Sequence, residues 1–305
     1  MGAVGGMLSS SPGERGTTVY HNASGRMERK ITMKKVLTLV LALTMALSLV
    51  ACGGEGGGSK GDKKLKILET EYALEDYAIC ISKDNQELLD KVNGALAALA
   101  ADGTTKKIVD KYISGVEHDL TFQTDAEGKP ELIMATNATF PPYEYYEDDK
   151  IVGIDAEMAA AIADQLGMKL TIVDTEFGSI IGGVQTGKYD MGMAGMTITE
   201  ERLASINFSD VYATGVQVVI VTEDSPIATV DDLLDPDKGY KVGVQQDTTG
   251  DIFMSDTYEN GGVGEDNVIR YKAGTEAVQA LLTGKVDAVV IDQEPAKAYV
   301  ETNNK

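Results

Sequence analysis

The sequence predicts an α/β protein. Stretches with helical spacing of apolar residues alternate with short apolar runs from residue 66 to the end of the chain, which is the pattern of α/β architecture. The run Gly215–Val221 is almost continuously apolar, as expected for a buried strand. A length of 305 residues suffices for two lobes of ordinary domain size.

The first part of this pattern is predicted to hold two strands, two helices and a linker. We expect strands at Lys66–Leu68 and Tyr77–Ile81. Leucine and valine recur at helical spacing in Asn85–Ala101, which predicts an amphipathic helix closed by a following glycine. Thr105–Ile113 is a second predicted helix. Residues 116–130 are polar and show no period, and we interpret them as a joining linker because connections this long are uncommon inside a domain.

The remainder of the chain continues the alternation. Strands are expected at Leu132–Thr136, Lys169–Val173, Asp190–Met193, Gly215–Val221, Lys241–Val244, Val268–Tyr271 and Ala288–Ile291. Helices are expected at Ala156–Leu166, Ser179–Thr186, Val230–Leu234, Thr249–Met254, Thr275–Thr283 and Glu294–Val300. Asp155 is the N-cap candidate of the first of these helices, because Asp is a favoured capping residue.

Residues 33–52 have the features of a secretory signal. A basic start at Met33 is followed by the uncharged run Val36–Ala51, which is shorter than the about 20 residues of a spanning helix. The segment ends Leu49-Val-Ala-Cys-Gly53, which resembles the lipobox of bacterial lipoproteins. This resemblance implies cleavage before Cys52 and lipidation of Cys52. The alternatives are a plain signal peptide and a membrane anchor.

The segments on either side of this signal have simpler interpretations. Residues 53–63 are rich in Gly and form a predicted flexible tether. Residues 1–32 show no hydrophobic period, and we interpret them as an over-extended start, with Met27 or Met33 as the initiator. A cytoplasmic extension is the alternative.

Charge and cysteine content restrict the partners. Six of the 27 basic and two of the 48 acidic residues lie in residues 1–52, which leaves 21 basic and 46 acidic residues and a net charge of −25 beyond them. Nucleic acid is therefore excluded as a partner, since its phosphates require clustered Lys and Arg. Cys52 and Cys80 are the only cysteines, so no disulfide framework is expected, and Cys80 is predicted to be a buried structural thiol.

Several stretches resemble the polar-amino-acid family of extracellular solute-binding proteins of ATP-binding-cassette (ABC) importers. They are Thr136-Asn-Ala-Thr-Phe-Pro-Pro-Tyr-Glu144, Ile151-Val-Gly-Ile-Asp155, Gly195-Met-Thr-Ile-Thr-Glu-Glu-Arg202, Phe208-Ser-Asp210, Val242-Gly-Val-Gln-Gln-Asp-Thr-Thr-Gly250 and Gly284-Lys-Val-Asp-Ala288. Residues 131–143 resemble the beginning of such a protein, whereas residues 65–114 resemble its end. The resemblance therefore implies a circular permutation, in which the usual order would be 131–305 followed by 65–114. Chance similarity of a helical extension is the alternative.

The resemblance implies a two-lobed periplasmic-binding-protein type II fold. Lobe 1 would comprise residues 77–115 and 130–217, lobe 2 residues 64–74 and 222–305, and two strands would cross between them. The implied function is that of a monomeric, extracytoplasmic receptor, anchored to the cell membrane as a lipoprotein. It would capture a free, polar amino acid between the lobes by hinge closure and deliver it to an ABC permease.

Two charged residues are candidates for the two charged ends of an amino acid. The guanidinium of Arg202 can pair with a carboxylate, supported by Gly195 and Thr197 and by Thr248 and Thr249 at a helix start. The alternative for Arg202 is a surface ion pair with a neighbouring glutamate. Asp292 follows an apolar strand and is the candidate for the ammonium group, with a helix N-cap as the alternative role.

The ligand side chain has an aromatic candidate. Phe140 lies in a loop that two prolines stiffen and can serve as a platform, the alternative being an ordinary core residue. Asn137 and Phe177 are weaker candidates, and Glu144, which allows a basic ligand, is weaker still. Ala194 and Gly195 stand where several family members have serines. Asp247 stands where the family often has Gly, so that its carboxylate must point away from a bound carboxylate.

Other functions are less well supported. A dehydratase-like enzyme on this fold needs a general acid, and a sensor needs no catalytic residue. No Ser-His-Asp set, zinc spacing or phosphate loop is visible in the sequence, so that neither an enzyme nor a cofactor is expected.

Overall fold

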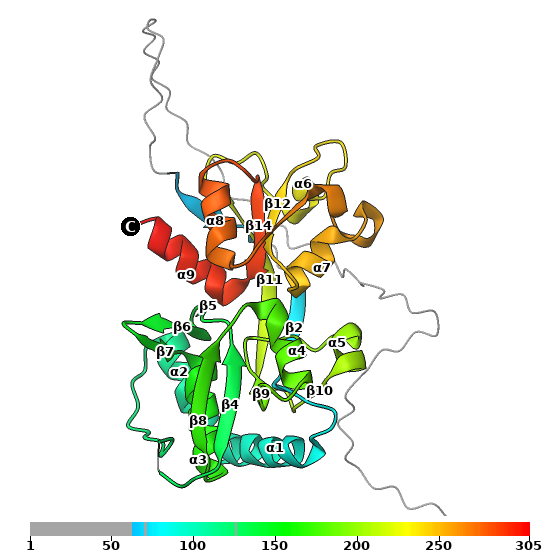
Figure 1. Cartoon of the computed structure of the whole chain (residues 1–305). Helices are drawn as coiled ribbons and strands as arrows, with labels where there is room; N and C mark the ends of the chain where they lie inside the picture. The colour runs from blue at the N-terminus through cyan, green and yellow to red at the C-terminus, as the bar shows by residue number, and fades with distance from the viewer. Residues whose placement is uncertain (1–62, 70–71, 126) are drawn as a thin grey trace, which may run out of the picture. The chain divides into compact units, whose positions relative to one another are not determined.

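A computed structural model describes residues 63–69, 72–125 and 127–305. The predictions for the start, the signal peptide, Cys52 and residues 53–62 lie outside these residues. All described elements belong to one compact unit, residues 58–305. Helices and sheets form two lobes within this unit, each built on its own mixed sheet (Figure 1). Within the described ranges, no helix is long and apolar enough to cross a membrane.

Lobe 1 contains the sheet of order β10-β3-β9-β4-β8 and a small β5-β6-β7 sheet. Its strands are β3 (Cys80–Ile81), β4 (Glu131–Thr136), β5 (Thr139–Phe140), β6 (Glu144–Glu147), β7 (Lys150–Val152), β8 (Lys169–Asp174), β9 (Met191–Gly192) and β10 (Asn207–Phe208). Its helices are α1 (Gln86–Ala101), α2 (Thr104–Ser114), α3 (Ile154–Gln165), the 3-10 turn Phe177–Ser179, α4 (Ile180–Gln185) and α5 (Glu200–Ser205).

Lobe 2 contains the sheet of order β1-β11-β14-β12-β13, to which β2 is added along β11. Its strands are β1 (Leu65–Ile67), β2 (Ala73–Tyr77), β11 (Ala213–Thr222), β12 (Val242–Gln245), β13 (Val268–Tyr271) and β14 (Ala288–Asp292). Its helices are α6 (Val230–Leu233), α7 (Thr249–Ser255), the 3-10 turns Tyr258–Asn260 and Glu265–Asn267, α8 (Gly274–Leu282) and α9 (Gln293–Asn303).

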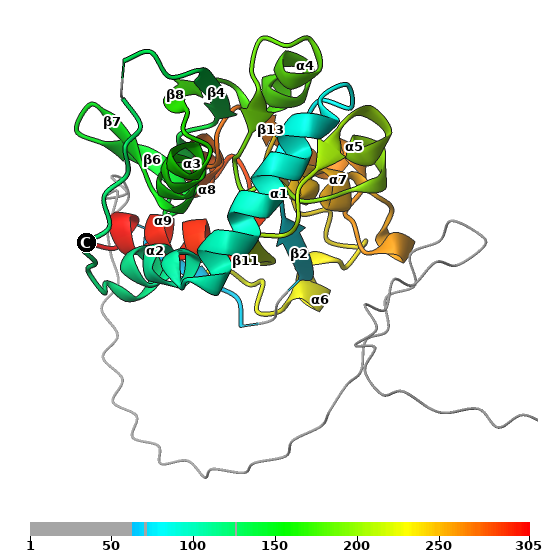
Figure 2. The same ribbon diagram turned by 90° about the horizontal axis from the view of Figure 1, so that it is seen from below.

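Residues 218–221 of strand β11 show why this part of the sequence is apolar. Val219 and Val221 pack into one hydrophobic cluster of lobe 2, whereas Val218 and Ile220 pack into the cluster on the other face. A strand that is covered on both faces has no side for polar residues. In lobe 1, α1, α2 and α3 cover one face of the sheet and α4 the other (Figures 1 and 2).

The segment 65–114 is built into both lobes. β1 pairs with β11 in lobe 2, with Leu65 opposite Thr222. β2 pairs with β11 over Ala73–Tyr77, and β3 lies between β9 and β10 of lobe 1. The backbone of Leu65 exchanges two hydrogen bonds of 2.8 Å with the side chain of Asn304, close to the last residue of the chain. Residues 65–114 are therefore part of the two-lobed fold and not a separate appendage.

β2 and β11 form an antiparallel ribbon that connects the lobes. Ala213–Gln217 pair with Ala73–Tyr77, and beyond this ladder a bridge joins Tyr77 to Thr197. Both strands are seen between the two lobes in Figure 1. We call this pair the β2–β11 ribbon.

Several local predictions were wrong. The strand expected at Tyr77–Ile81 is interrupted, because the chain leaves β2 at Tyr77 and enters β3 of the other sheet at Cys80. Asp155 does not cap α3, whose N-cap is Gly153; Asp155 lies in the first turn and is buried. The strands β5, β6 and β7 were not predicted, because their residues show no apolar alternation.

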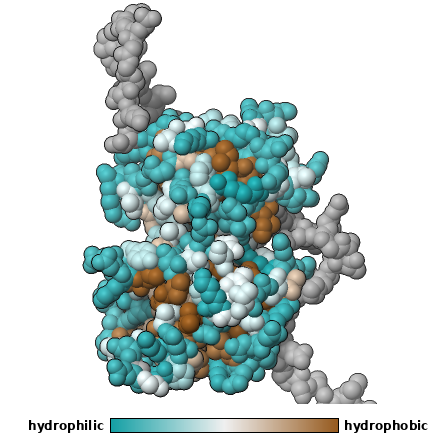
Figure 3. Space-filling model, viewed as in Figure 1, coloured by the Kyte–Doolittle hydropathy of each residue, from teal (hydrophilic) through white to brown (hydrophobic). Residues whose placement is uncertain are grey.

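The segment 116–130 has no regular helix or strand in its described part, yet it contacts lobe 1. Leu120 and Phe122 pack against the core, and carbonyls of Thr124 and Pro130 accept hydrogen bonds from β8. Cys80 is free and fully buried, as expected. The face in Figure 3 is mainly hydrophilic with separate apolar patches, in keeping with the acidic composition.

Candidate functional site

The residues predicted to bind a ligand lie together around one pocket between the lobes. Its lining consists of Asn137, Phe140, Phe177, Ala194, Gly195, Thr197, Arg202, Thr248, Thr249 and Asp292, together with Glu144 and Gln245. In lobe 1, the lining residues follow β4 and β9 or lie on β5, β6, the 3-10 turn and α5. In lobe 2, they lie at the ends of β12 and β14 and at the start of α7. Ligands of α/β sheets gather at such strand ends.

Arg202 is a buried cation at this pocket. It is 7% exposed, and its Nη1 donates to the carbonyl of Thr197 at 2.7 Å. Its Nη2 donates to the carbonyl of Asp247 at 2.9 Å, and its guanidinium lies 5.3 Å from the centre of the Phe177 ring. Burial lowers the pKa of Arg202. Two of its five N–H groups serve these carbonyls, and the others are suited to a carboxylate.

Asp292 carries a buried carboxyl group at the same pocket. Its Oδ1 accepts a hydrogen bond from the Tyr77 hydroxyl and its Oδ2 one of 2.9 Å from Nε2 of Gln217. Although Asp292 occupies the N-cap position of α9, its side chain makes no capping hydrogen bond. Burial, and then the nearby Glu75 carboxyl, raise the pKa of Asp292 well above its usual range. The carboxylate is thus turned into the site and away from the helix.

Glu75 on β2 extends this network to lobe 1. Its Oε2 accepts hydrogen bonds from the Thr197 hydroxyl at 3.1 Å and from Gln217 at 3.0 Å. Gln217 also lies 3.4 Å from the Thr249 hydroxyl. The β2–β11 ribbon, which carries Glu75 and Gln217, therefore forms the floor beneath the pocket.

Further polar contacts join the lobes around the pocket. Nε2 of Gln245 donates to Oδ1 of Asn137 at 2.8 Å, and this pair is buried. An exposed ion pair of 2.6 Å joins Lys272 to Glu176. Phe140 packs against both a lobe 1 and a lobe 2 cluster.

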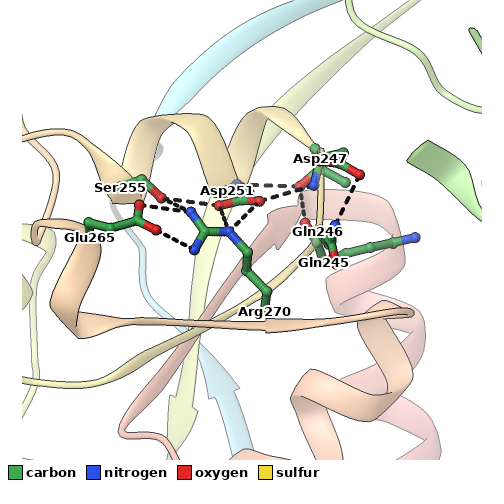
Figure 4. A network of polar contacts seen from close by, with 8 residues as sticks. Gln245, Gln246, Asp247, Asp251, Ser255, Glu265 and Arg270 are labelled. Carbon is green, nitrogen blue, oxygen red and sulfur yellow. Dashed lines mark hydrogen bonds and ion pairs between the residues drawn. The ribbon is translucent and has the colours of Figure 1, made fainter.

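The turn before α7 is held by a charged network (Figure 4). Arg270 lies 2.9 Å from the Asp251 carboxylate and 2.6 Å from Glu265. Asp251 in turn accepts a 3.0 Å hydrogen bond from the backbone N–H of Asp247. This fixes the start of α7, where Thr248 and the following threonine line the pocket. Three linked side chains, those of Arg270, Asp251 and Glu265, thus hold a lining segment in place.

Asp247 itself does not line the pocket. Its φ of 65° lies in the left-handed region, which explains why Gly suits this position. Its carboxylate lies against Gly178 of lobe 1, where an added Cβ would be 2.1 Å from Oδ2. The side chain therefore faces a neighbouring groove, away from a carboxylate bound at Arg202.

Two buried carboxyl groups of lobe 1 lie at the pocket, where Glu144 lines it and Asp155 bonds the lining residue Gly195. Glu144 is 1% exposed, and burial raises its pKa well above its usual range. Asp155 accepts 2.9 Å hydrogen bonds from the Gly195 N–H and the Tyr212 hydroxyl. Burial raises the pKa of Asp155 to about 6. The described residues contain no group of three or more His, Cys, Asp or Glu that could hold a metal ion.

Sequence reasoning missed Gln245, Glu75 and Gln217. A signal was present for two of them. Gln217 is the polar residue in an otherwise apolar buried strand, and Gln245 is the polar residue that ends one. Glu75 carried no such signal, because its role depends on the pairing of β2 with a strand about 140 residues away.

Residues 132–299 match the sequence profile of the bacterial extracellular solute-binding proteins, family 3. The chain belongs to this family. The match spans β4 to α9, which includes every lining residue of the pocket. Glu75 and the rest of residues 65–114 lie outside it.

Individual proteins and solved structures also match more than half of this chain. The arginine-binding extracellular protein ArtP of Bacillus subtilis (strain 168) is 33% identical over 177 residues, which are 58% of this chain and 67% of the relative. The holo structure of ArgBP from T. maritima superposes with a TM-score of 0.52 and 40% identity, covering 57% of this chain and 74% of that chain. The structure of an ancestral amino acid-binding protein, a precursor of cyclohexadienyl dehydratase, superposes with a TM-score of 0.51 and 34% identity. This match covers 56% of this chain and 74% of that chain.

Proposed function

We propose that this solute-binding protein captures a free amino acid with a cationic side chain for an ABC importer. The observation that carries the proposal is that a buried guanidinium, Arg202, and a buried carboxylate, Asp292, face one pocket between two lobes. A free amino acid carries the two complementary charges. The carboxylate would pair with Arg202, and the ammonium group with Asp292.

The preference for a ligand with a cationic side chain rests on the acidic residue Glu144. Glu144 lines the pocket and is buried, and neither of its oxygens has a hydrogen-bond donor within the described residues. A cationic group that reaches Glu144 would meet this need, since buried charges in proteins are paired. The ring of Phe140 offers a face to the aliphatic part of the ligand. Several relatives bind arginine, which is consistent with this preference.

Closure around the ligand would follow from contacts to both lobes. Arg202, Asn137 and Phe140 belong to lobe 1, whereas Asp292, Gln245 and Thr249 belong to lobe 2. A ligand that binds both sets stabilises the closed arrangement, and the closed form would be recognised by the permease.

Calorimetric titration with a panel of amino acids tests the proposal. We expect arginine, lysine or ornithine to bind more tightly than glutamine and glutamate. Arg202→Ala should weaken binding of each ligand by about 1.5–3 kcal/mol or more, because it removes a charge-assisted hydrogen-bond pair. Thermal unfolding of the variant serves as the folding control. Absence of any amino-acid ligand, or undiminished binding by Arg202→Ala, would contradict the proposal.

A dehydratase-like activity is the second candidate, since Glu144, whose pKa burial raises well above its usual range, lines the pocket and one structural neighbour is a precursor of such an enzyme. General acid catalysis requires a group of this kind. Incubation with a cyclohexadienyl carboxylic acid, followed by chromatography, decides between binding and turnover. We expect binding without turnover.

We further propose that Cys52 carries the lipid anchor, on the support of its position after Leu49-Val-Ala51. Metabolic labelling with a fatty acid should mark the wild-type protein and fail with Cys52→Ala. Cys80→Ala changes the other cysteine and should keep the label. Loss of membrane association only in Cys52→Ala would agree with this role.

A further inference from the structure

Two buried carboxyl groups lie near each other at the pocket. Glu144 on β6 and Asp155 on α3 are 1% and 0% exposed, and neither oxygen of Glu144 nor Oδ1 of Asp155 has a hydrogen-bond partner within the described residues. Two neighbouring carboxylates that are buried without donors repel each other, which disfavours ionisation of both. Such a pair is expected to hold one proton.

One of the four oxygens of this pair has donors in the described part of the chain. Oδ2 of Asp155 accepts hydrogen bonds from Gly195 and Tyr212, whereas Oδ1 of Asp155 and both oxygens of Glu144 have no hydrogen-bond partner there. The titratable groups that act on Glu144 from the neighbouring elements are all acidic. They are Asp155, Asp174, Asp292, Tyr143, Tyr212 and Tyr299.

The electrostatics agree with this geometry. Burial is the first cause that raises the pKa of Glu144, and the charge of Asp155 is the second. The main causes of this shift include no cation, and Arg202, the cation that lines the same pocket, donates to the carbonyls of Thr197 and Asp247. A cation that enters with a ligand is the remaining means of stabilising Glu144 as a carboxylate.

We propose that the cationic side chain of a bound amino acid displaces the proton of the Glu144–Asp155 pair. This inference rests on the proposed function. The guanidinium or ammonium group of the ligand binds beside Glu144 in place of the proton. The O–H bond of the carboxylic acid breaks, and the electron pair of this bond stays on the carboxylate. The proton passes to water, so that one cation replaces one proton. A neutral side chain leaves the proton where it is.

The pair exists independently of lobe closure. Both carboxyl groups belong to lobe 1, as do Gly195 and Tyr212, which hold Asp155. Separation of the lobes would remove Asp292 and Tyr299 from the neighbourhood of Glu144 but would leave its partner in place. Proton release is therefore expected on binding to the open form as well.

Calorimetric titration with L-arginine at one pH, in two buffers of different ionisation enthalpy, measures the protons exchanged. We expect release of up to one proton per arginine near neutral or mildly acidic pH. Arginine affinity should accordingly rise with pH, by up to tenfold per pH unit for one proton. L-glutamine is the reference ligand, because its ammonium group would meet Asp292 in the same way but its side chain is neutral. Glu144→Gln keeps the shape of the side chain but cannot ionise, and should abolish the release that arginine shows beyond glutamine. Glu147→Gln on the same strand is exposed and should preserve it.

Two outcomes would overturn the inference. Arginine binding without proton exchange between pH 5 and 8 would refute it while leaving the proposed function intact. Carbon-13 NMR titration of the unliganded protein, with Glu144→Gln for assignment, would refute it if Glu144 titrates in the ordinary glutamate range. Failure of every amino acid to bind would remove the proposed function and this inference together.

Discussion

At the scale of the residue, Gly195 shows how closely the pocket is packed. Its φ is 52°, and a Cβ at this position would lie 2.7 Å from Cε1 of Phe140. Its N–H is bound to Asp155. Glycine here allows the backbone to approach the aromatic platform and to remain tied to the buried carboxyl.

We predict that Gly195→Ala weakens amino-acid binding at least tenfold, about 1.4 kcal/mol, because the new methyl displaces the Phe140 ring. Gly187→Ala is the matched control, since Gly187 also has a positive φ, 72°, but no atom within 4 Å of an added Cβ. Both variants should lose about 1–2 kcal/mol of unfolding free energy from left-handed strain. Equal affinities in the two variants would contradict the role of the contact.

The buried Asp155 also predicts a pH dependence of stability. Its pKa is raised from 3.8 to about 6, so that the folded protein binds more protons than the unfolded chain between these values. Its contribution to the unfolding free energy therefore falls as pH rises through this window, by about 3 kcal/mol for this shift. Urea unfolding at pH 4 to 7 should show a flatter profile for Asp155→Asn than for wild type. The exposed Asp149→Asn should follow the wild-type profile.

Residue chemistry allowed much of the pocket lining to be predicted from sequence. An amino acid needs one cationic and one anionic partner, and the candidates Arg202 and Asp292 lie at one pocket. The remaining contacts depend on three-dimensional neighbours. Nothing local indicates that Glu75 approaches Thr197, or that Asp155 is buried in the first turn of a helix, where its residue type is also suited to capping.

At the scale of the element, α9 and β1 depend on one side chain. Asn304 follows α9 and bonds both the N–H and the carbonyl of Leu65 at the start of β1. The contact joins the first described strand to the last helix and closes the edge of the lobe 2 sheet. Such an edge otherwise presents unpaired backbone groups.

We predict that Asn304→Ala lowers the unfolding free energy by about 1–3 kcal/mol, because it removes two hydrogen bonds to buried backbone. Asn303→Ala is the neighbouring control. Its amide bonds only the Tyr299 carbonyl of its own helix, so that its loss should cost less than about 1 kcal/mol. Chemical denaturation of both variants measures the difference. Equal losses would show that β1 is held by its pairing with β11 alone.

Elements with a strong period were predicted within one or two residues. The helices α1, α2 and α8 and the strands β4, β12, β13 and β14 are examples. The short strands β5 to β7 lack such a period. The passage of the chain from one sheet to the other between β2 and β3 could not be predicted either. A continuous apolar stretch gives no indication that these two strands belong to different lobes.

At the scale of the whole molecule, the order of segments stays a proposal of circular permutation. Leu65 lies beside Asn304, and residues 65–114 supply strands to both lobes. About a quarter of the T. maritima relative lies outside the matched region. Chain ends that meet at a surface permit such a rearrangement.

We predict that a rearranged chain with residues 130–305, a short Gly-Ser linker and residues 63–115 folds and binds the same amino acids as the natural order. The linker spans a gap that Asn304 and Leu65 already bridge. The cut removes residues 116–129, whose described part contains no helix or strand. Circular dichroism and calorimetry check fold and affinity. A deletion of residues 63–115 is the control and should unfold, because it removes β1, β2, β3, α1 and α2. An unfolded rearranged chain would contradict the proposal.

The β2–β11 ribbon has a mechanical consequence. Because it connects the lobes and also carries Glu75 and Gln217, these groups lie at the fulcrum of any opening motion. Forces at a fulcrum exert little torque, whereas contacts away from it, such as Gln245 with Asn137 and Lys272 with Glu176, act on a longer lever. Ligand contacts near the ribbon would then mainly determine the affinity for the ligand. Ligand contacts near the distant inter-lobe pairs would mainly determine the stability of the closed arrangement.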